Sequence, residues 1–162
     1  MSEIYLARDF MEIAISEAEI AKENGDVPVG AVIIKNNEII AKSHNQVVLQ
    51  NDALAHAEII AIKEASKKLN QKYLNDCDLY VSLEPCPMCA GAIVLAKIKR
   101  VYIGAEDSKT GAGGSVYNIL QDKRLNHYCE VYSRIAQAQC SKILSDFFTQ
   151  LRKENRYQQI NG

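Results

Sequence analysis

Two cysteines three residues apart, Cys86 and Cys89, lie between a β-branched segment and an apolar run, in the stretch "LYVSLEPCPMCAGAIVLAKI". Pro87 suits the first turn of a helix, because the N–H group that proline lacks would have no helical partner there. Cysteines at positions i and i+3 face the same side of a helix. The stretch therefore predicts a strand followed by a helix that begins with two thiols, which could serve as metal ligands, as a redox pair or as inert packing residues.

Further strands and helices alternate along the chain. The pair Asn36-Asn37 separates two β-branched runs and predicts a tight hairpin, because asparagine tolerates the positive φ that such a turn requires. The expected strands are 29–35, 38–43, 77–83, 100–105 and 128–135, and the expected helices cover about 11–21, 59–69, 90–98 and 136–153. This alternation predicts an α/β sheet covered by helices on both faces.

Composition limits the classes of protein that the chain can belong to. With 162 residues, of which 48% are hydrophobic, it is expected to form a single domain over 1–162, with a short polar tail after the C-terminal helix. The formal charge of −1 provides no general field for a polyanion, so any contact with nucleic acid must be local. The sequence shows neither a signal peptide nor a membrane span, and a cytoplasmic location without membrane contact is expected.

The five cysteines form an odd set in a chain without an export signal, which argues against a disulfide framework. Outside the Cys86–Cys89 pair, Cys77, Cys129 and Cys140 are expected to pack as small apolar residues, with Cys77 nearest to the surface.

A second motif, His56-Ala57-Glu58, stands at the start of another expected helix. If the two helices lie side by side, His56, Cys86 and Cys89 can bind one ion, and the fourth tetrahedral position stays open for water, as in catalytic zinc sites. His44 and His127 have no spacing that recommends them as a fourth ligand. Glu58 would then be the carboxylate that carries protons, although most glutamates at such positions are surface residues.

His-x-Glu followed by Pro-Cys-x-x-Cys is the signature of the zinc-dependent nucleobase deaminases. The surrounding segments resemble the bacterial tRNA-specific adenosine deaminases in particular, in the cytidine deaminase-like superfamily. The segments that carry the resemblance are "VPVGAVI", "AHAEIIAI", "LYVSLEPCPMCAGAI", "IGAEDSKTGAGGS", the pair Asn126-His127 and "LSDFF".

The resemblance implies a three-layer α/β/α sandwich around a five-stranded mixed sheet, a homodimer, and one Zn²⁺ per chain. It also implies the reaction, which is hydrolytic deamination of the wobble adenosine in a tRNA anticodon stem-loop to inosine. In that reaction hydroxide held by zinc attacks C6 of the base, and Glu58 shuttles the protons.

The resemblance further places Asn45 and the backbone of Ala57 against the target base, with a strand-end turn as the alternative role for Asn45. It makes the "KTGAGGS" loop, which matches no common phosphate-binding motif, a border of the bound RNA. The expected RNA contacts in and beside this loop are Asp107, Lys109 and Thr110. On the C-terminal helix, Arg152, Lys153 and Arg156 form a cationic cluster for phosphates, or else an ordinary solvated helix end.

Two departures from the family pattern stand near the site: Ala53-Leu54 follows Asp52 where Pro-Thr is common, and Gln46 occupies a position where arginine is common. Three other functions are compatible with parts of the pattern. They are a deaminase of free bases or nucleotides, a zinc-dependent RNA-binding subunit without activity, and a thiol redox protein. Glu58 and the open fourth ligand position argue against the second, and His56-Ala57-Glu58 is unexplained by the third.

Overall fold

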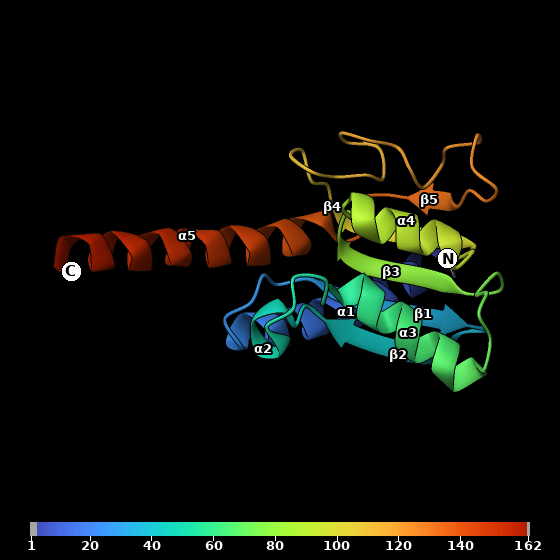
Figure 1. The fold of residues 1–162 in the computed structure, drawn as a ribbon, viewed down its shortest axis with the longest axis horizontal. Helices are drawn as coiled ribbons and strands as arrows, with labels where there is room; N and C mark the ends of the chain where they lie inside the picture. Colours follow the sequence, from blue (N-terminus) through green and yellow to red (C-terminus); the bar gives the residue numbers. More distant parts are fainter. Residues whose placement is uncertain (1–2, 162) are drawn as a thin grey trace.

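The computed structural model describes residues 3–161 and is built around a five-stranded sheet (Figure 1). Its strands are β1 (Gly30–Lys35), β2 (Glu38–His44), β3 (Asp78–Leu83), β4 (Arg100–Ala105) and β5 (Glu130–Tyr132), in the spatial order β2-β1-β3-β4-β5. Strand β1 pairs antiparallel with both β2 and β3, whereas β3, β4 and β5 run parallel. The mixed sheet expected from the sequence is thus confirmed.

Helices cover both faces of this sheet. Helices α3 (Ala57–Leu69) and α4 (Pro87–Leu95) lie side by side in front of it in Figure 1, while α1 (Glu3–Glu23) packs behind it with the start of α5 (Gln137–Asn161). Within β1, Ala31 and Ile33 join the core beneath α3 and α4, whereas Val32 and Ile34 join the core beneath α1. This alternation gives the sheet two apolar faces, so the fold is the expected α/β/α sandwich.

The β1–β2 turn follows the sequence prediction. Asn36 and Asn37 have φ angles of 50° and 61°, and Lys35 pairs with Glu38 across the turn. Two consecutive positive φ angles define a tight hairpin whose twist matches that of its strands. The hairpin directs β2 back toward Asn45 and the short helix α2 (Val47–Gln50), at the end of the sheet where the site lies.

Three elements end at other residues than expected. Helix α4 stops at Leu95 rather than Ile98, because Lys97 adopts a φ of 59° and ends the helical path. Strand β5 is reduced to three residues, Glu130–Tyr132. Helix α5 continues to Asn161, so residues 154–161, which were expected to form a polar tail, are helical. These residues include neither proline nor glycine, and Gln150 donates a hydrogen bond to Glu154 four residues later.

Cys77, Cys129 and Cys140 are buried free thiols, as expected for small packing residues. The expectation that Cys77 lies nearest to the surface is wrong, since its exposed fraction is 0%. The chain after α3 folds back so that the N–H of Leu74 bonds to the carbonyl of Ala96, which brings Cys77 under the end of α4. Burial raises the pKa of the Cys77 thiol to about 12.

Within residues 3–161, no helix combines the length and apolar character needed to cross a membrane.

Candidate metal and substrate site

The N-termini of α3 and α4 meet at one end of the sheet (Figure 1). His56 is the N-cap residue of α3 and Cys86 is the N-cap residue of α4, and both have extended backbones. Because His56 stands before the first helical turn, its side chain and that of Glu58 can approach the same point, although residues two apart on a regular helix diverge by about 200°. The junction predicted for the His-x-Glu pair is therefore present.

Three side chains from these two helix ends form a group that fits a tetrahedral metal. The Nδ1 atom of His56 lies 3.7 Å from Sγ of Cys86 and 3.4 Å from Sγ of Cys89. Zinc–sulfur and zinc–nitrogen bonds of about 2.3 and 2.0 Å at tetrahedral angles separate nitrogen from sulfur by about 3.6 Å. The two nitrogen–sulfur distances thus match those between zinc ligands, all three donor atoms lie within 4.8 Å of one another, and His56 and Cys86 face an open cavity.

The other two histidines are engaged elsewhere. His44 contacts Glu17 on α1 at 2.7 Å, and Nε2 of His127 lies 2.7 Å from the carbonyl oxygen of Ile98. Within residues 3–161, only one group of three or more histidine, cysteine, aspartate or glutamate side chains lies close enough together to hold an ion. It consists of His56, Cys86 and Cys89.

The two thiols differ in their ionisation. Hydrogen bonds from Cys89 and from His56 lower the pKa of Cys86 to about 4, so its thiolate form prevails at neutral pH. The hydrogen bond to that thiolate and burial raise the pKa of Cys89. A metal ion would find one ligand already deprotonated and would displace the proton of the second.

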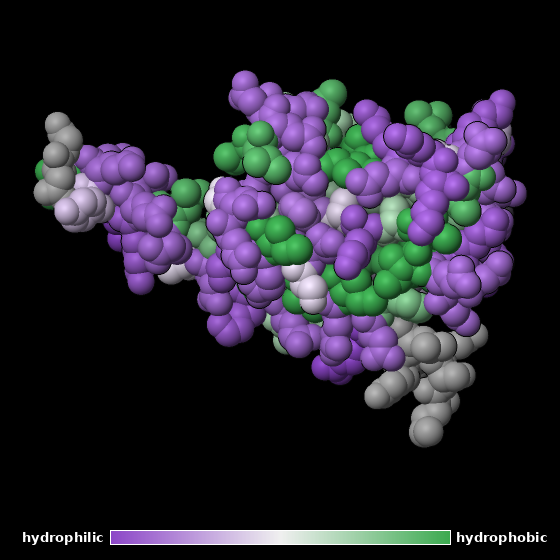
Figure 2. Space-filling model, turned by 90° about the horizontal axis from the view of Figure 1, so that it is seen from below, coloured by the Kyte–Doolittle hydropathy of each residue, from purple (hydrophilic) through white to green (hydrophobic). Residues whose placement is uncertain are grey.

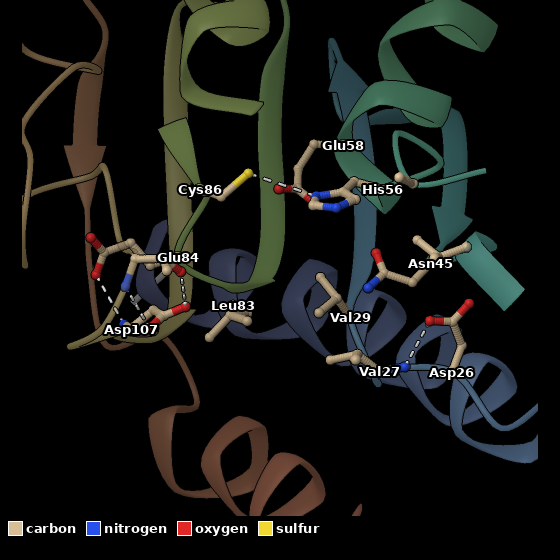
Figure 3. Close-up of a pocket in the computed structure, with 13 residues that line it drawn as sticks. Asp26, Val27, Val29, Asn45, His56, Glu58, Leu83, Glu84, Cys86 and Asp107 are labelled. Carbon is tan, nitrogen blue, oxygen red and sulfur yellow. Dashed lines mark hydrogen bonds between the residues drawn. The ribbon is translucent and has the colours of Figure 1, made fainter. Parts of the chain in front are cut away.

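Glu58 lies beside this group with an exposed fraction of 3%, which excludes the surface-glutamate alternative. Burial raises the pKa of its carboxyl group, so that the group can hold and release a proton nearer to neutral pH. Figure 3 shows Glu58 and His56 side by side at the cavity. Glu58 is thus available as an acid and base.

A cavity of about 360 Å³ opens in front of these residues. Asn45, His56, Glu58 and Cys86 line it together with residues of the 107–110 turn (Figure 3). Volumes of this size are typical of sites for small-molecule ligands.

Asn45 and Ala57 are brought together, but only Asn45 lines the cavity. The N–H of Ala57 donates to Oδ1 of Asn45 at 2.9 Å, and the carbonyl of Ala57 accepts a bond from the hydroxyl of Ser43 at 2.6 Å. Ala57 is fully buried. Its backbone therefore orients Asn45, whose amide nitrogen is left to donate to a ligand.

The turn after β4 forms the opposite wall of the cavity. The carboxylate of Asp107 accepts bonds from the backbone N–H groups of Lys109 and Thr110 at 2.9 and 3.1 Å, and from the Thr110 hydroxyl at 2.8 Å. Asp107 and Thr110 line the cavity, whereas Lys109 lines a neighbouring groove. The glycine-rich loop is thus a tightly hydrogen-bonded turn.

This groove, of about 570 Å³, lies between the turn and α5. It shares Asp107 and Thr110 with the cavity and is also lined by Phe148 and Arg152. Arg156 follows Arg152 by one helical turn and lies on the same side of α5. Lys153 instead lines a separate hollow with Gln150, Glu154, Tyr157 and Gln158, so the structure does not join the three expected cations into one patch.

Two acidic residues that the sequence reasoning missed also line the cavity. Asp26 accepts bonds from the N–H groups of Val27 and Val48, which ties the end of α1 to α2. Glu84 is 4% exposed and accepts bonds from the loop after β4. A carboxylate between a buried strand and Cys86 was the signal that could have identified Glu84.

Comparison with known proteins agrees with this geometry. The family model of the MafB19-like deaminases matches residues 7–152. The tRNA-specific adenosine deaminase of Bacillus subtilis is 47% identical over 147 residues, which are 91% of each chain, and that of Aquifex aeolicus is 49% identical over 143 residues, 88% of this chain and 94% of the relative. A solved structure of a tRNA:A34 deaminase, studied for A-to-I editing at the wobble position of transfer RNA, superimposes with a TM-score of 0.81 at 44% identity, covering 84% of this chain and 99% of that one.

A mixed sheet with a buried glutamate next to a His-Cys-Cys group at two helix ends defines a deaminase of the cytidine deaminase-like fold. The relatives narrow this class further. The chain belongs to the tRNA-specific adenosine deaminase family.

Proposed function

We propose that the protein is a zinc-dependent tRNA deaminase that converts the wobble adenosine of an anticodon loop to inosine. The observation that carries the proposal is the buried carboxyl group of Glu58, held beside three metal-binding side chains at the wall of an open cavity. A tRNA substrate implies that the reaction occurs in the cytoplasm.

His56, Cys86 and Cys89 would hold one zinc ion through Nδ1 and the two Sγ atoms, whose spacing fits a tetrahedral site. When bound, zinc would act as a Lewis acid and lower the pKa of a water molecule. Glu58 would take one proton from the attacking water as its oxygen adds to C6 of adenine, and would deliver that proton to N1 of the ring. Glu58 would then take the remaining proton from the hydroxyl group added at C6 and deliver it to the exocyclic nitrogen, so that the C6–N bond breaks, ammonia leaves and the C6 carbonyl of inosine forms.

Asn45 would orient the base. The hydrogen bond from the Ala57 N–H to Oδ1 fixes the orientation of the amide, and its NH₂ group can donate to an acceptor on the purine edge. Ala57 would thus contribute indirectly, through the hydrogen bond by which its backbone orients Asn45. The walls formed by Asn45 and by the Asp107–Thr110 turn would keep the base within reach of Glu58 and exclude bulk water.

The groove beside the cavity would hold the nucleotides next to the target. Phe148 is 40% exposed and can stack on a base, while Lys109 and Arg152 can contact phosphates. Arg156 and Lys153 would add cationic charge farther along α5, whose projecting end is covered mostly by hydrophilic residues in Figure 2. An anticodon loop is already single-stranded, so flipping its base costs less than in a duplex.

A homodimer is supported by the surface of α4. This helix contains no charged residue, and Leu95 on its outer side is 77% exposed. The outward row also includes Pro87, Met88, Gly91 and Ala92, all partly or fully exposed. A helix that is apolar nearly all round is normally buried, so a second copy of the chain is the proposed cover.

Competition between substrates tests the proposed function. The zinc-loaded protein is incubated with a tRNA bearing A at the wobble position, together with free adenosine, cytosine, guanine and their nucleotides. We expect deamination of the RNA alone. Turnover of a free base with none on RNA would overturn the choice of substrate. Binding of RNA without turnover would favour a non-catalytic subunit. A reversible Cys86–Cys89 disulfide without metal binding would favour a redox protein.

A further inference from the structure

Glu84 is a buried acid that the proposed reaction does not use. It lies between the end of β3 and Cys86, lines the cavity, and is 4% exposed. Within residues 3–161, no lysine, arginine or histidine forms an ion pair with it. A buried carboxylate without a cationic partner requires hydrogen bonds to compensate for lost hydration.

Those hydrogen bonds all come from the loop after β4. Oε1 accepts from the N–H of Asp107 at 3.2 Å and from the hydroxyl of Ser115, and Oε2 accepts from the N–H groups of Gly113 and Ser115, both at 3.0 Å. Each carboxylate oxygen thus serves two donors, which is about its full capacity. Gly111 lies so close that an added Cβ would collide with Oε2.

The same loop carries the wall of the cavity. Glu84 holds the backbone of Asp107, and the side chain of Asp107 in turn holds Lys109 and Thr110. The chain of bonds therefore leads from the strand that precedes the metal-binding Cys86 to the groups that face the proposed RNA. Figure 3 shows Glu84 and Asp107 joined on the wall opposite Asn45.

We infer that Glu84 is a positioning residue for substrate RNA, which fixes the 107–115 loop in its RNA-binding shape before the substrate arrives. The inference rests on the proposed function. It assigns Glu84 to binding and not to the chemical step, because its oxygens are saturated by loop donors and have no capacity left for the base or for a transferred proton.

The test is Glu84→Gln. Glutamine keeps one acceptor oxygen and places an NH₂ group against donors, so at least one loop bond is lost. We expect the KM for an anticodon stem-loop RNA to rise about tenfold or more, since a hydrogen bond to a charged group contributes at least this factor to an equilibrium. The kcat at saturating RNA and the zinc content should stay close to those of the parent protein, and Glu64→Gln, at an exposed position on α3, is the matched control.

Hydrogen–deuterium exchange gives a readout that needs no activity. Peptides covering 107–118 should exchange faster in Glu84→Gln than in the parent protein, while peptides of α3 should not change. If the parent protein formed no inosine, the proposed function would fail, and the exchange measurement would still decide whether Glu84 anchors the loop.

Two results would overturn the inference. One is a loss of kcat or of zinc at unchanged KM, and the other is unchanged exchange in the loop. Should Glu84→Gln not fold, Ser115→Ala removes only the hydroxyl donor and should raise KM in the same direction by a smaller factor; an unchanged KM in that variant would count against the inference.

Discussion

Glu58 has to remain ionisable while almost no part of it touches solvent. Its position at the second residue of α3 resolves this conflict, since the helix N-terminus stabilises negative charge while burial disfavours it. His56 and Glu58 lie at the start of α3, whereas Cys86 and Cys89 lie at the start of α4, so the two helix ends together bring the acid and the candidate metal ligands to the same point.

Replacing Glu58 by glutamine should abolish proton transfer and preserve the metal site. We expect kcat to fall by a factor of about 10² to 10⁴, the usual contribution of a general acid–base residue. Zinc should stay at one per chain, because Glu58 is outside the group of three ligands. Inosine assays and metal analysis on the same sample check this, and loss of zinc would show that Glu58 is a ligand.

Metal removal should expose one particular thiol. Cys86 is the one cysteine of five that is not buried, and its pKa of about 4 makes it a thiolate at neutral pH. In chelator-treated protein, iodoacetamide should label Cys86 first, while zinc-loaded protein is protected. Peptide mass spectrometry gives the labelled position. Equal labelling of Cys77, whose thiol is buried with a pKa of about 12, would contradict the burial described above.

At this scale the sequence predicted which side chains come together as candidate ligands and acid, because each belongs to a motif of three or four consecutive residues. The sequence did not predict that Glu84 and Asp26 line the cavity, and the reason is physical. Their hydrogen-bond partners lie 22 to 31 residues away in the sequence, apart from one neighbouring N–H group, and only the fold brings them together. The burial of Cys77 likewise depends on how the α3–β3 connection packs under α4.

Among the elements, the β1–β2 hairpin depends most directly on local sequence. Both residues of its turn, Asn36 and Asn37, have positive φ angles. Asn37→Ala should lower the free energy of unfolding by about 1 kcal/mol, because the Cβ of alanine is strained in the left-handed region and alanine lacks the short polar side chain with which asparagine can form local hydrogen bonds there. Asn37→Gly should leave stability equal or higher. Denaturant titrations measure both, and an equal loss in the two variants would show that the side chain, and not the backbone angle, matters.

The ends of the elements were harder to predict than their presence. The helix of Cys86 and Cys89 was expected to reach Ile98, but Lys97 adopts a positive φ angle, which a lysine in the sequence does not predict. Helix α5 was expected to end near residue 153, yet its last turns continue to Asn161, and the side chains of residues 154–160 are exposed. Residues of good helix propensity can extend a helix without packing, and hydrophobic periodicity gives no sign of such turns.

For the whole molecule, alternation of strands and helices predicted the layers but not the strand order. Because β3 lies between β1 and β4, the N-termini of α3 and α4 meet at the site. This strand order follows from packing across the sheet. The same packing leaves the outer side of α4 uncovered within the single chain.

The uncovered side of α4 predicts the state of association. The parent protein should migrate as a dimer in size-exclusion chromatography with light scattering, and Leu95→Glu should shift it toward the monomer, because a charge would enter an apolar interface. Ile160→Glu is the matched control, since Ile160 is 82% exposed on the distal part of α5. A parent protein that is monomeric at all concentrations would contradict the proposed dimer.

The most direct measurement for the central claim is inosine at the wobble position of an in vitro transcribed tRNA with an A-starting anticodon, with metal content determined on the same protein sample. The account predicts inosine at that position alone, together with about one zinc per chain. Zinc without inosine would contradict the claim that this site deaminates tRNA and would direct attention to free bases and nucleotides.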